Sequence, residues 1–155
     1  MTEHSFNDWD VTNDGVMGGL SQGHVMLSNK ITVFSGAISI ENNGGFTSVF
    51  TKISTLSKDI KSIHVRIVGD GNTYQLRIRS KVMGYNLAYK IAFKTKVNTV
   101  ETHCFTLADF EASFRGRSIT SAPLLQAHVI THVGFLVSAK QRSHFSLAIH
   151  SIVFK

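Results

Sequence analysis

The sequence predicts a single all-β domain in which two sheets pack as a sandwich. From Val25 onward, apolar and polar residues alternate with a period of two through most of the chain, which is the pattern of strands buried on one face. Spacings typical of an amphipathic helix are nearly absent. Many short strands with few helices favour a sandwich or a barrel. No linker or repeat divides the chain, so we expect one domain over residues 1–155.

The clearest strands lie in the middle of the chain. In residues 62–68 every second residue is Ile or Val, and residues 73–80 and 86–95 repeat this alternation. Further strands are predicted at Val25–Leu27, Ile31–Phe34, Ala37–Ile40, Thr47–Thr51, His103–Leu107, His132–Ser138 and His144–Phe154. The segments Asn42–Gly45, Gly69–Asn72 and Met83–Gly84 between them have the composition of turns.

The last strand changes phase along its length. Apolar residues take odd-numbered positions up to Ile149 and even-numbered positions from Ile152. One extra residue near His150 or Ser151 explains the change, because a bulge exchanges the two faces of a strand. The only helical element expected is a short turn within residues 107–114.

Composition and the single cysteine limit the class of protein. With 43% hydrophobic residues, the chain can bury a core without a metal or a disulfide. Cys104 is the only cysteine, so no internal disulfide forms and the cytoplasm is the expected location. Residues 1–10 contain acids and no apolar run, so they do not predict a secretory signal. Residues 118–139 lack charged side chains, but Pro123 and the shortness of the apolar runs argue against a membrane span.

The formal net charge of +6 favours acidic partners. Lys and Arg are scattered along the chain, and neither a zinc-finger spacing nor an aromatic-basic RNA motif is present. We therefore do not expect nucleic acid as the partner.

No catalytic or metal-binding constellation is visible in the sequence. His128 and His132 have the spacing of two zinc ligands on a helix, but in a strand four residues span about 13 Å. Cys104 has no nucleophile motif around it and is expected to be a small apolar strand residue. We expect a non-catalytic protein without a cofactor or metal. An enzyme would need a cleft that raises the pKa of one of three acids, namely Asp14, Glu41 or Asp70.

Polar positions of the middle strands carry an excess of basic residues. They are Arg66, Gln75, Arg77, Arg79, Lys90 and Lys94. If these strands are neighbours, one sheet has a basic outer face. Such a face is either simply solvated or a docking surface for an acidic protein or a polar ligand.

The segment from Trp9 to Ser21 has an unusual composition for a loop. It contains the only Trp, a Met and three glycines, together with polar side chains that can fix a loop by bonding to the backbone. Two interpretations remain open: an ordered loop capped by Trp9 on the core, or a binding rim.

Several motifs resemble the complex-I-intermediate-associated protein family in order along the chain. The two most specific are Trp9 with Asn13–Gly19 and Ser21, and Phe34-x-Gly36 leading to Glu41–Phe46 and Ser48. Weaker matches are Gly69–Gly71 with Tyr74, Phe110 with Phe114–Arg117, and Gly134–Leu136 with Lys140, Gln141 and Phe145. The resemblance implies a jelly-roll sandwich that is galactose-binding-domain-like.

The resemblance also implies a function. Mitochondrial members of the family are assembly factors for respiratory complex I and act by binding partners. The implied partner is therefore a protein, such as a respiratory-complex subunit or an assembly intermediate. The same fold includes carbohydrate-binding modules. A sugar or another small polar ligand is therefore the alternative, and it would need exposed aromatic platforms. The candidates for such platforms are Trp9, Tyr74, Tyr85 and Tyr89.

Together the motifs define a candidate binding surface. Its residues are Trp9, Asn13, Asp14, Met17, Ser21, Glu41, Asn42, Asn43, Phe46, Arg115, Arg117 and Gln141. Arg115 and Arg117 would bond either to Asp14 and Glu41 within the fold or to acids of a partner.

Overall fold

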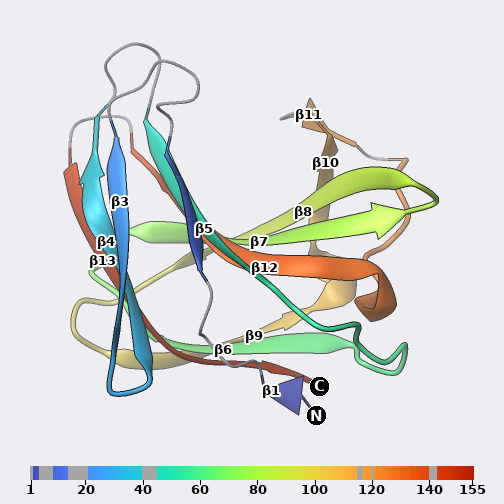
Figure 1. The fold of residues 1–155 in the computed structure, drawn as a ribbon, viewed down its shortest axis with the longest axis horizontal. Helices are drawn as coiled ribbons and strands as arrows, with labels where there is room; N and C mark the ends of the chain where they lie inside the picture. The colour runs from blue at the N-terminus through green and yellow to red at the C-terminus, as the bar shows by residue number, and fades with distance from the viewer. Residues whose placement is uncertain are drawn as a thin grey trace.

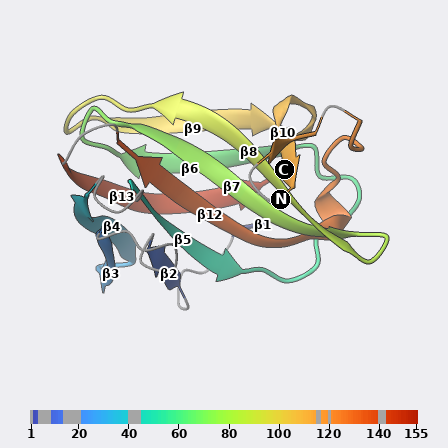
Figure 2. The same ribbon diagram turned by 90° about the horizontal axis from the view of Figure 1, so that it is seen from above.

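The computed structural model describes residues 2–3, 9–13, 21–39, 45–114, 117–119, 121–139 and 143–155. Within these ranges the chain forms two antiparallel β-sheets that enclose a common core (Figures 1 and 2). The only helices described are two 3₁₀ turns, Leu107–Asp109 and Ala127–Val129. Neither is long or apolar enough to span a membrane.

The first sheet has six strands, with the long strand β13 at its centre. Its members are β1 (Thr2–Glu3), β3 (Gln22–Ser28), β4 (Ile31–Ile38), β6 (Ser62–Val68), β9 (Val100–Thr106) and β13 (Ser143–Phe154). The order is β3-β4-β13-β6-β9, and β1 pairs with the end of β13. The two ends of the described chain therefore lie side by side (Figures 1 and 2).

The second sheet has seven strands and is strongly twisted. Its members are β2 (Asp10–Asn13), β5 (Phe46–Lys52), β7 (Thr73–Val82), β8 (Tyr85–Lys94), β10 (Glu111–Phe114), β11 (Arg117–Ser118) and β12 (Ile130–Ser138). The order is β11-β10-β8-β7-β12-β5-β2. In Figure 1, β10 stands nearly upright while β7, β8 and β12 run across the view.

The core lies between the sheets and uses one face of each strand. On β7, Tyr74, Leu76 and Ile78 are almost fully buried, while the residues between them face outward. On β13, Leu147 and Ile149 do the same from the opposite sheet. The alternation in the sequence therefore reports real burial, and the predicted all-β sandwich is confirmed.

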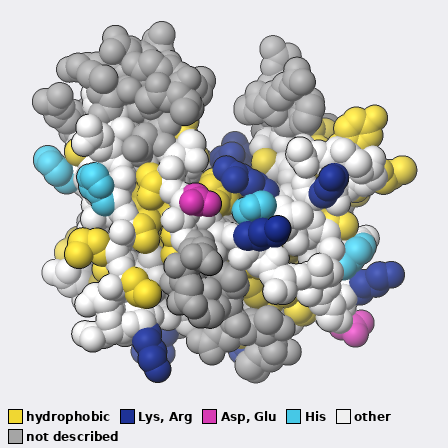
Figure 3. Space-filling view, in the orientation of Figure 1, with side chains coloured by type: hydrophobic (Ala, Val, Ile, Leu, Met, Phe, Trp, Pro, Cys, Tyr) yellow, Lys and Arg dark blue, Asp and Glu magenta, His cyan; other side chains and the backbone are white. Residues whose placement is uncertain are grey.

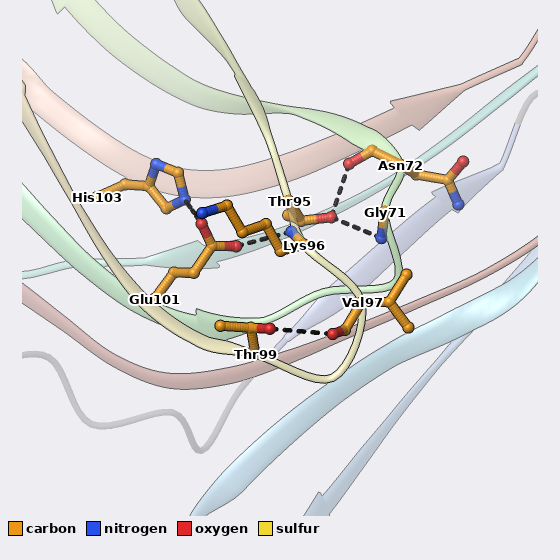
Figure 4. Close-up of polar contacts among 8 residues, drawn as sticks. All are labelled: Gly71, Asn72, Thr95, Lys96, Val97, Thr99, Glu101 and His103. Carbon is orange, nitrogen blue, oxygen red and sulfur yellow. Dashed lines mark hydrogen bonds and ion pairs between the residues drawn. The ribbon is translucent and has the colours of Figure 1, made fainter.

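A polar junction at the turn between β6 and β7 joins the two sheets. Asp70 accepts hydrogen bonds from the Tyr74 phenol of β7 at 3.0 Å and from the Ser146 amide of β13 at 2.7 Å. Beside it, Thr95 Oγ1 donates to the Asn72 carbonyl at 2.8 Å (Figure 4). Because Tyr74 and Ser146 belong to different sheets, Asp70 fixes their relative position at this end of the sandwich.

Most predicted strands are present, and the exceptions have local causes. The predicted bulge is confirmed, since the β13–β6 register shifts between Ile149 and Ser151. Residues 31–40, predicted as two strands, contain the single strand β4 through Gly36. The predicted helical turn over 107–114 is wrong beyond residue 109, because residues 111–114 form β10, in which residues 111–113 pair with β8.

Candidate functional site

Three of the predicted binding segments lie partly outside the described residues. The strand ends that flank them meet at one end of the sandwich. Asn13 pairs with Thr47, and the Ala139 amide donates to the Gly45 carbonyl at 3.1 Å. Ile38, at the end of β4, pairs with Ser143. The sandwich therefore provides a common base for these segments.

Three of the predicted site residues have described side chains, and two of them have internal roles. Trp9 packs against the core, with its ring centroid 6.5 Å from that of Phe135. Ser21 is 3% exposed, and its hydroxyl accepts from the Ser39 amide at 2.9 Å and donates to the Ser39 carbonyl at 3.1 Å. Phe46 is half-buried on the outer face of β5.

For Asn13 and Arg117 the structure gives only the position of the backbone. Asn13 ends β2 and Arg117 begins β11, and these strands are the opposite edges of the seven-stranded sheet. The strand order therefore places Arg117 at the sheet edge opposite Asn13, away from the strand ends that flank the other predicted segments. The remaining candidates lie outside the described residues: Asp14, Met17, Glu41, Asn42, Asn43, Arg115 and Gln141.

The outer face of the seven-stranded sheet carries the predicted basic surface, with one correction. Gln75, Arg77 and Arg79 alternate with core residues of β7, and Lys90 faces Arg77 from β8. Arg66 does not belong to this surface, because β6 lies in the other sheet. Lys94 is exposed at the end of β8, opposite Thr73. The residues that define what we call the basic face are Lys52, Gln75, Arg77, Arg79, Lys90 and His132.

The strand register arranges these side chains in rows across the sheet. One row runs from Asp10 through Phe50, Gly134, Arg77 and Lys90 to Glu111. The next row contains Lys52, His132 and Arg79. Acidic residues thus stand at the outer ends of a row whose middle is basic. In Figure 3, Lys and Arg side chains gather in the middle of the molecule beside a His and an acidic side chain.

A stacked arginine forms the centre of the basic face. The Arg79 guanidinium carbon lies 3.7 Å from the centroid of the Phe50 ring. Phe50 in turn lies over Gly134, where a Cβ atom would come within 2.6 Å of the Phe50 ring. The ring is only 7% exposed. Stacking of this kind holds a guanidinium in place while its edge stays able to donate hydrogen bonds.

Positive charge on the basic face exceeds the nearby negative charge. Burial lowers the pKa of Arg77, and the neighbouring Arg79 lowers it further. Burial also lowers the pKa of Arg79, while Asp10 opposes that shift. Among the described residues neither guanidinium forms an ion pair, and Arg77 donates to the neutral Gln75 at 2.8 Å. An anion placed here would meet two partly desolvated arginines.

His132 lies at the edge of the same cluster. Burial lowers the pKa of His132, the charges of Arg79 and Lys52 lower it further, and Asp10 raises it. The imidazole is therefore neutral near pH 7. An open pocket of about 400 Å³ adjoins the cluster and is lined in part by Arg79, Asn86, Thr131 and His132.

Most aromatic platforms that a sugar would require are not available. Tyr74 and Tyr89 are 0% and 1% exposed and belong to the core. Trp9 packs inward, as described above. Tyr85 is 69% exposed at the β7–β8 hairpin, which makes it the one exposed member of the four predicted candidates.

Within the described residues no three His, Cys, Asp or Glu side chains lie close enough to hold a metal ion. His128 and His132 are separated, since the former lies in a 3₁₀ turn and the latter in β12.

The sequence analysis missed Asp10, Phe50, Lys52 and His132 as members of this surface. The local pattern does not place Phe50 on the outer face, because Phe46, Ser48 and Phe50 share one face of the strand and Thr47, Val49 and Thr51 the other. The contacts of Phe50 with Arg79 and Gly134 depend on strand order, which the local pattern does not contain.

The fold is that of a galactose-binding-like β-sandwich. Two similar solved structures are family 11 carbohydrate-binding modules of Clostridium thermocellum. The module of the cellulosomal cellulase Lic26A-Cel5E has a TM-score of 0.70 at 11% identity, covering 97% of this chain and 93% of that chain. The module in complex with a β-1,3-1,4-mixed-linked tetrasaccharide has a TM-score of 0.69 at 12% identity, covering 96% and 91%. PfGH50B has a TM-score of 0.64 at 12% identity, covering 98% of this chain but 23% of its own.

The sequence itself specifies the family. The family model described as complex I intermediate-associated protein 30 matches residues 1–149, so the chain belongs to this family. No curated protein sequence matches the chain. The structural similarities, at these low identities, establish the shared fold alone.

Proposed function

We propose that this domain is a non-catalytic protein-binding module that acts in the assembly of a multi-subunit complex, with subunits or intermediates of respiratory complex I as its partners. Membership of the complex I intermediate-associated family over residues 1–149 supports the assembly role. We place the protein in the cytoplasm, in keeping with its single cysteine.

The observation that carries the binding mode is the unpaired positive charge of the basic face. Arg77 and Arg79 are partly desolvated and form no ion pair with any described residue. Carboxylates of a partner would form charge-assisted hydrogen bonds with them. An acidic segment is therefore the partner surface that this face fits, and the net charge of +6 would speed its association.

The test compares two charge-matched double variants of the tagged domain. R77Q/R79Q removes two charges from the basic face, and K58Q/K61Q removes two charges from the segment between β5 and β6. Extracts of the native cell are captured on each protein, and respiratory-complex subunits are quantified by mass spectrometry. We expect R77Q/R79Q to reduce their recovery by about tenfold or more, since truncating charged contacts costs several kcal/mol, and K58Q/K61Q to retain it.

Because Arg79 also packs on Phe50, the melting temperature of each variant is measured alongside. K90Q serves as a milder variant that leaves this stack intact. Equal recovery by both double variants would remove the basic face from the proposal. Absence of respiratory subunits from every capture would remove the assembly role itself.

A carbohydrate-binding function is the second candidate. One of the similar structures holds a mixed-linked tetrasaccharide, while the inward packing of Tyr74, Tyr89 and Trp9 opposes this function. Titration with mixed-linked β-glucan oligosaccharides distinguishes the two. Saturable binding of the glucan without capture of a respiratory subunit would favour the carbohydrate.

A further inference from the structure

Cys104 and His64 form a close pair on the outer face of the six-stranded sheet. The register places them directly opposite each other on β9 and β6, and Sγ of Cys104 lies 2.9 Å from Nδ1 of His64. The other ring nitrogen, Nε2, lies 2.9 Å from Oγ of Ser62. The thiol is exposed, and β9 is an edge strand. The thiol of Cys104, the imidazole of His64 and the hydroxyl of Ser62 are thus linked in series on an accessible surface.

One tautomer of His64 suits the hydrogen bonds around it. The Ser62 hydroxyl is placed to donate to the main-chain oxygen of Lys155 at 3.2 Å. Ser62 then accepts from Nε2 of His64, which carries the hydrogen in this arrangement. Nδ1 then presents its lone pair to Cys104. An oriented base within hydrogen-bond reach of a nucleophile is the arrangement that activates thiols.

The surrounding charges suit this role. Burial lowers the pKa of His64, and the charge of Lys155 lowers it further, so the imidazole is neutral and able to accept a proton near pH 7. The other charged group on this face of β6 is Arg66, which is exposed two positions along the strand. From β13, the apolar Val153 faces His64.

We propose that Cys104 is a site of reversible modification by low-molecular-weight disulfides, with His64 as the base and Ser62 as its positioning residue. The Cys104 proton passes to Nδ1 of His64, and the thiolate attacks one sulfur of the disulfide. A bond forms between Sγ and that sulfur while the original S–S bond breaks. The departing thiolate takes the proton from His64, so one disulfide is consumed and one mixed disulfide is formed.

This site is separate from the basic face. The basic face belongs to the seven-stranded sheet, whereas Cys104, His64 and Ser62 lie on the six-stranded sheet. A modified Cys104 would therefore carry its adduct on a different surface from the one proposed for the acidic partner. The result of testing one proposal therefore does not decide the other.

The single cysteine makes the test unambiguous, because any thiol reaction reports Cys104. The probes are oxidised glutathione, followed by intact mass, and 5,5′-dithiobis(2-nitrobenzoate), followed by absorbance. We expect the native protein to react at neutral pH at least about tenfold faster than the same chain unfolded in urea. We expect His64→Gln to abolish this advantage and to shift the pH–rate profile toward that of the unfolded chain.

His24→Gln is the matched control, since His24 is an exposed histidine on β3, the opposite edge strand of the same sheet. It should leave rate and profile unchanged. Ser62→Ala keeps the imidazole but removes its orienting partner, and we expect a rate loss of several-fold; this variant decides the matter if His64→Gln does not fold. Native, His64→Gln and unfolded rates within twofold of one another would overturn the proposal.

Discussion

At the scale of single residues, Gly134 controls the centre of the basic face. Its missing side chain lets the Phe50 ring approach β12 closely, and the ring then supports the Arg79 guanidinium. The three residues come from three neighbouring strands, β12, β5 and β7. The position of a charged group in this face is therefore set by the absence of a methyl group on the neighbouring strand.

Replacing Gly134 with Ala should destabilise the domain. The new Cβ would lie 2.6 Å from Cδ1 of Phe50 and close to the Val49 carbonyl, so ring and strand must both move. We expect a loss of about 1–3 kcal/mol in the free energy of unfolding, as for other overpacked sites, measured by urea denaturation. Capture of the acidic partner should weaken as well.

Gly84→Ala is the control for this change. Gly84 has φ +84° in the β7–β8 hairpin, but no atom lies within 4 Å of its added Cβ. Only backbone strain of about 1–2 kcal/mol is expected, with partner capture unaffected. If Gly134→Ala leaves partner capture intact, then the position of Phe50 does not set that of Arg79.

At the scale of elements, the β6–β7 turn couples β7 to β13. Asp70 accepts a hydrogen bond at 3.0 Å from the phenol of Tyr74, and Tyr74 is 0% exposed. Burial raises the pKa of Tyr74 well above its usual range, and the Asp70 charge raises it further. The native state therefore holds Tyr74 neutral at pH values where the unfolded chain would ionise it.

The sign of the resulting pH dependence follows from linkage. A raised pKa in the folded state stabilises the protein below the unfolded value of about 10, and that stability is lost as the pH rises above it. We expect the free energy of unfolding to fall above about pH 10, with a contribution from Tyr74 of about 1.4 kcal/mol per pH unit. Tyr74→Phe should be less stable at pH 7 and should show a shallower fall in alkali, measured by urea titration. An equally steep fall in the variant would contradict this account.

Most of the strands that the sequence predicted have one exposed and one buried face, although β5 is buried on both. β6 was predicted at its observed bounds because its alternation spans the whole strand, and the β13 bulge was predicted because it displaces that alternation. The short strands β1, β2, β10 and β11 were missed. Two to four residues carry no measurable period, and their pairing depends on neighbours distant in the chain.

The candidate sites were less predictable than the strands, for the same reason. The pairing of Phe50 with Arg79 and that of Cys104 with His64 both depend on which strands are adjacent and in which register. The sequence analysis treated Cys104 as an ordinary strand residue because its only neighbouring histidine along the chain is His103. The histidine that bonds to it is His64, 40 residues away.

At the scale of the whole molecule, one apolar cluster contains residues of both sheets. Neither sheet can lose its partner without exposing that cluster, so the two should unfold together. Trp9, the only Trp, packs on Phe135 of the seven-stranded sheet and reports on that side by fluorescence. We expect its urea transition to coincide with the far-ultraviolet circular dichroism of all strands. A fluorescence transition at lower urea would show that the sheets separate.

The central place of β13 has a consequence for the chain during its synthesis. The strand furthest along the sequence separates β3 and β4 on one side from β6 and β9 on the other. Until residues 143–154 leave the ribosome, β4 and β6 each present an unpaired edge, the kind of edge that invites pairing with a foreign chain. The nascent domain must pass through a period with two open sheet edges, and β13, the last of the described strands to be translated, is the one that closes both.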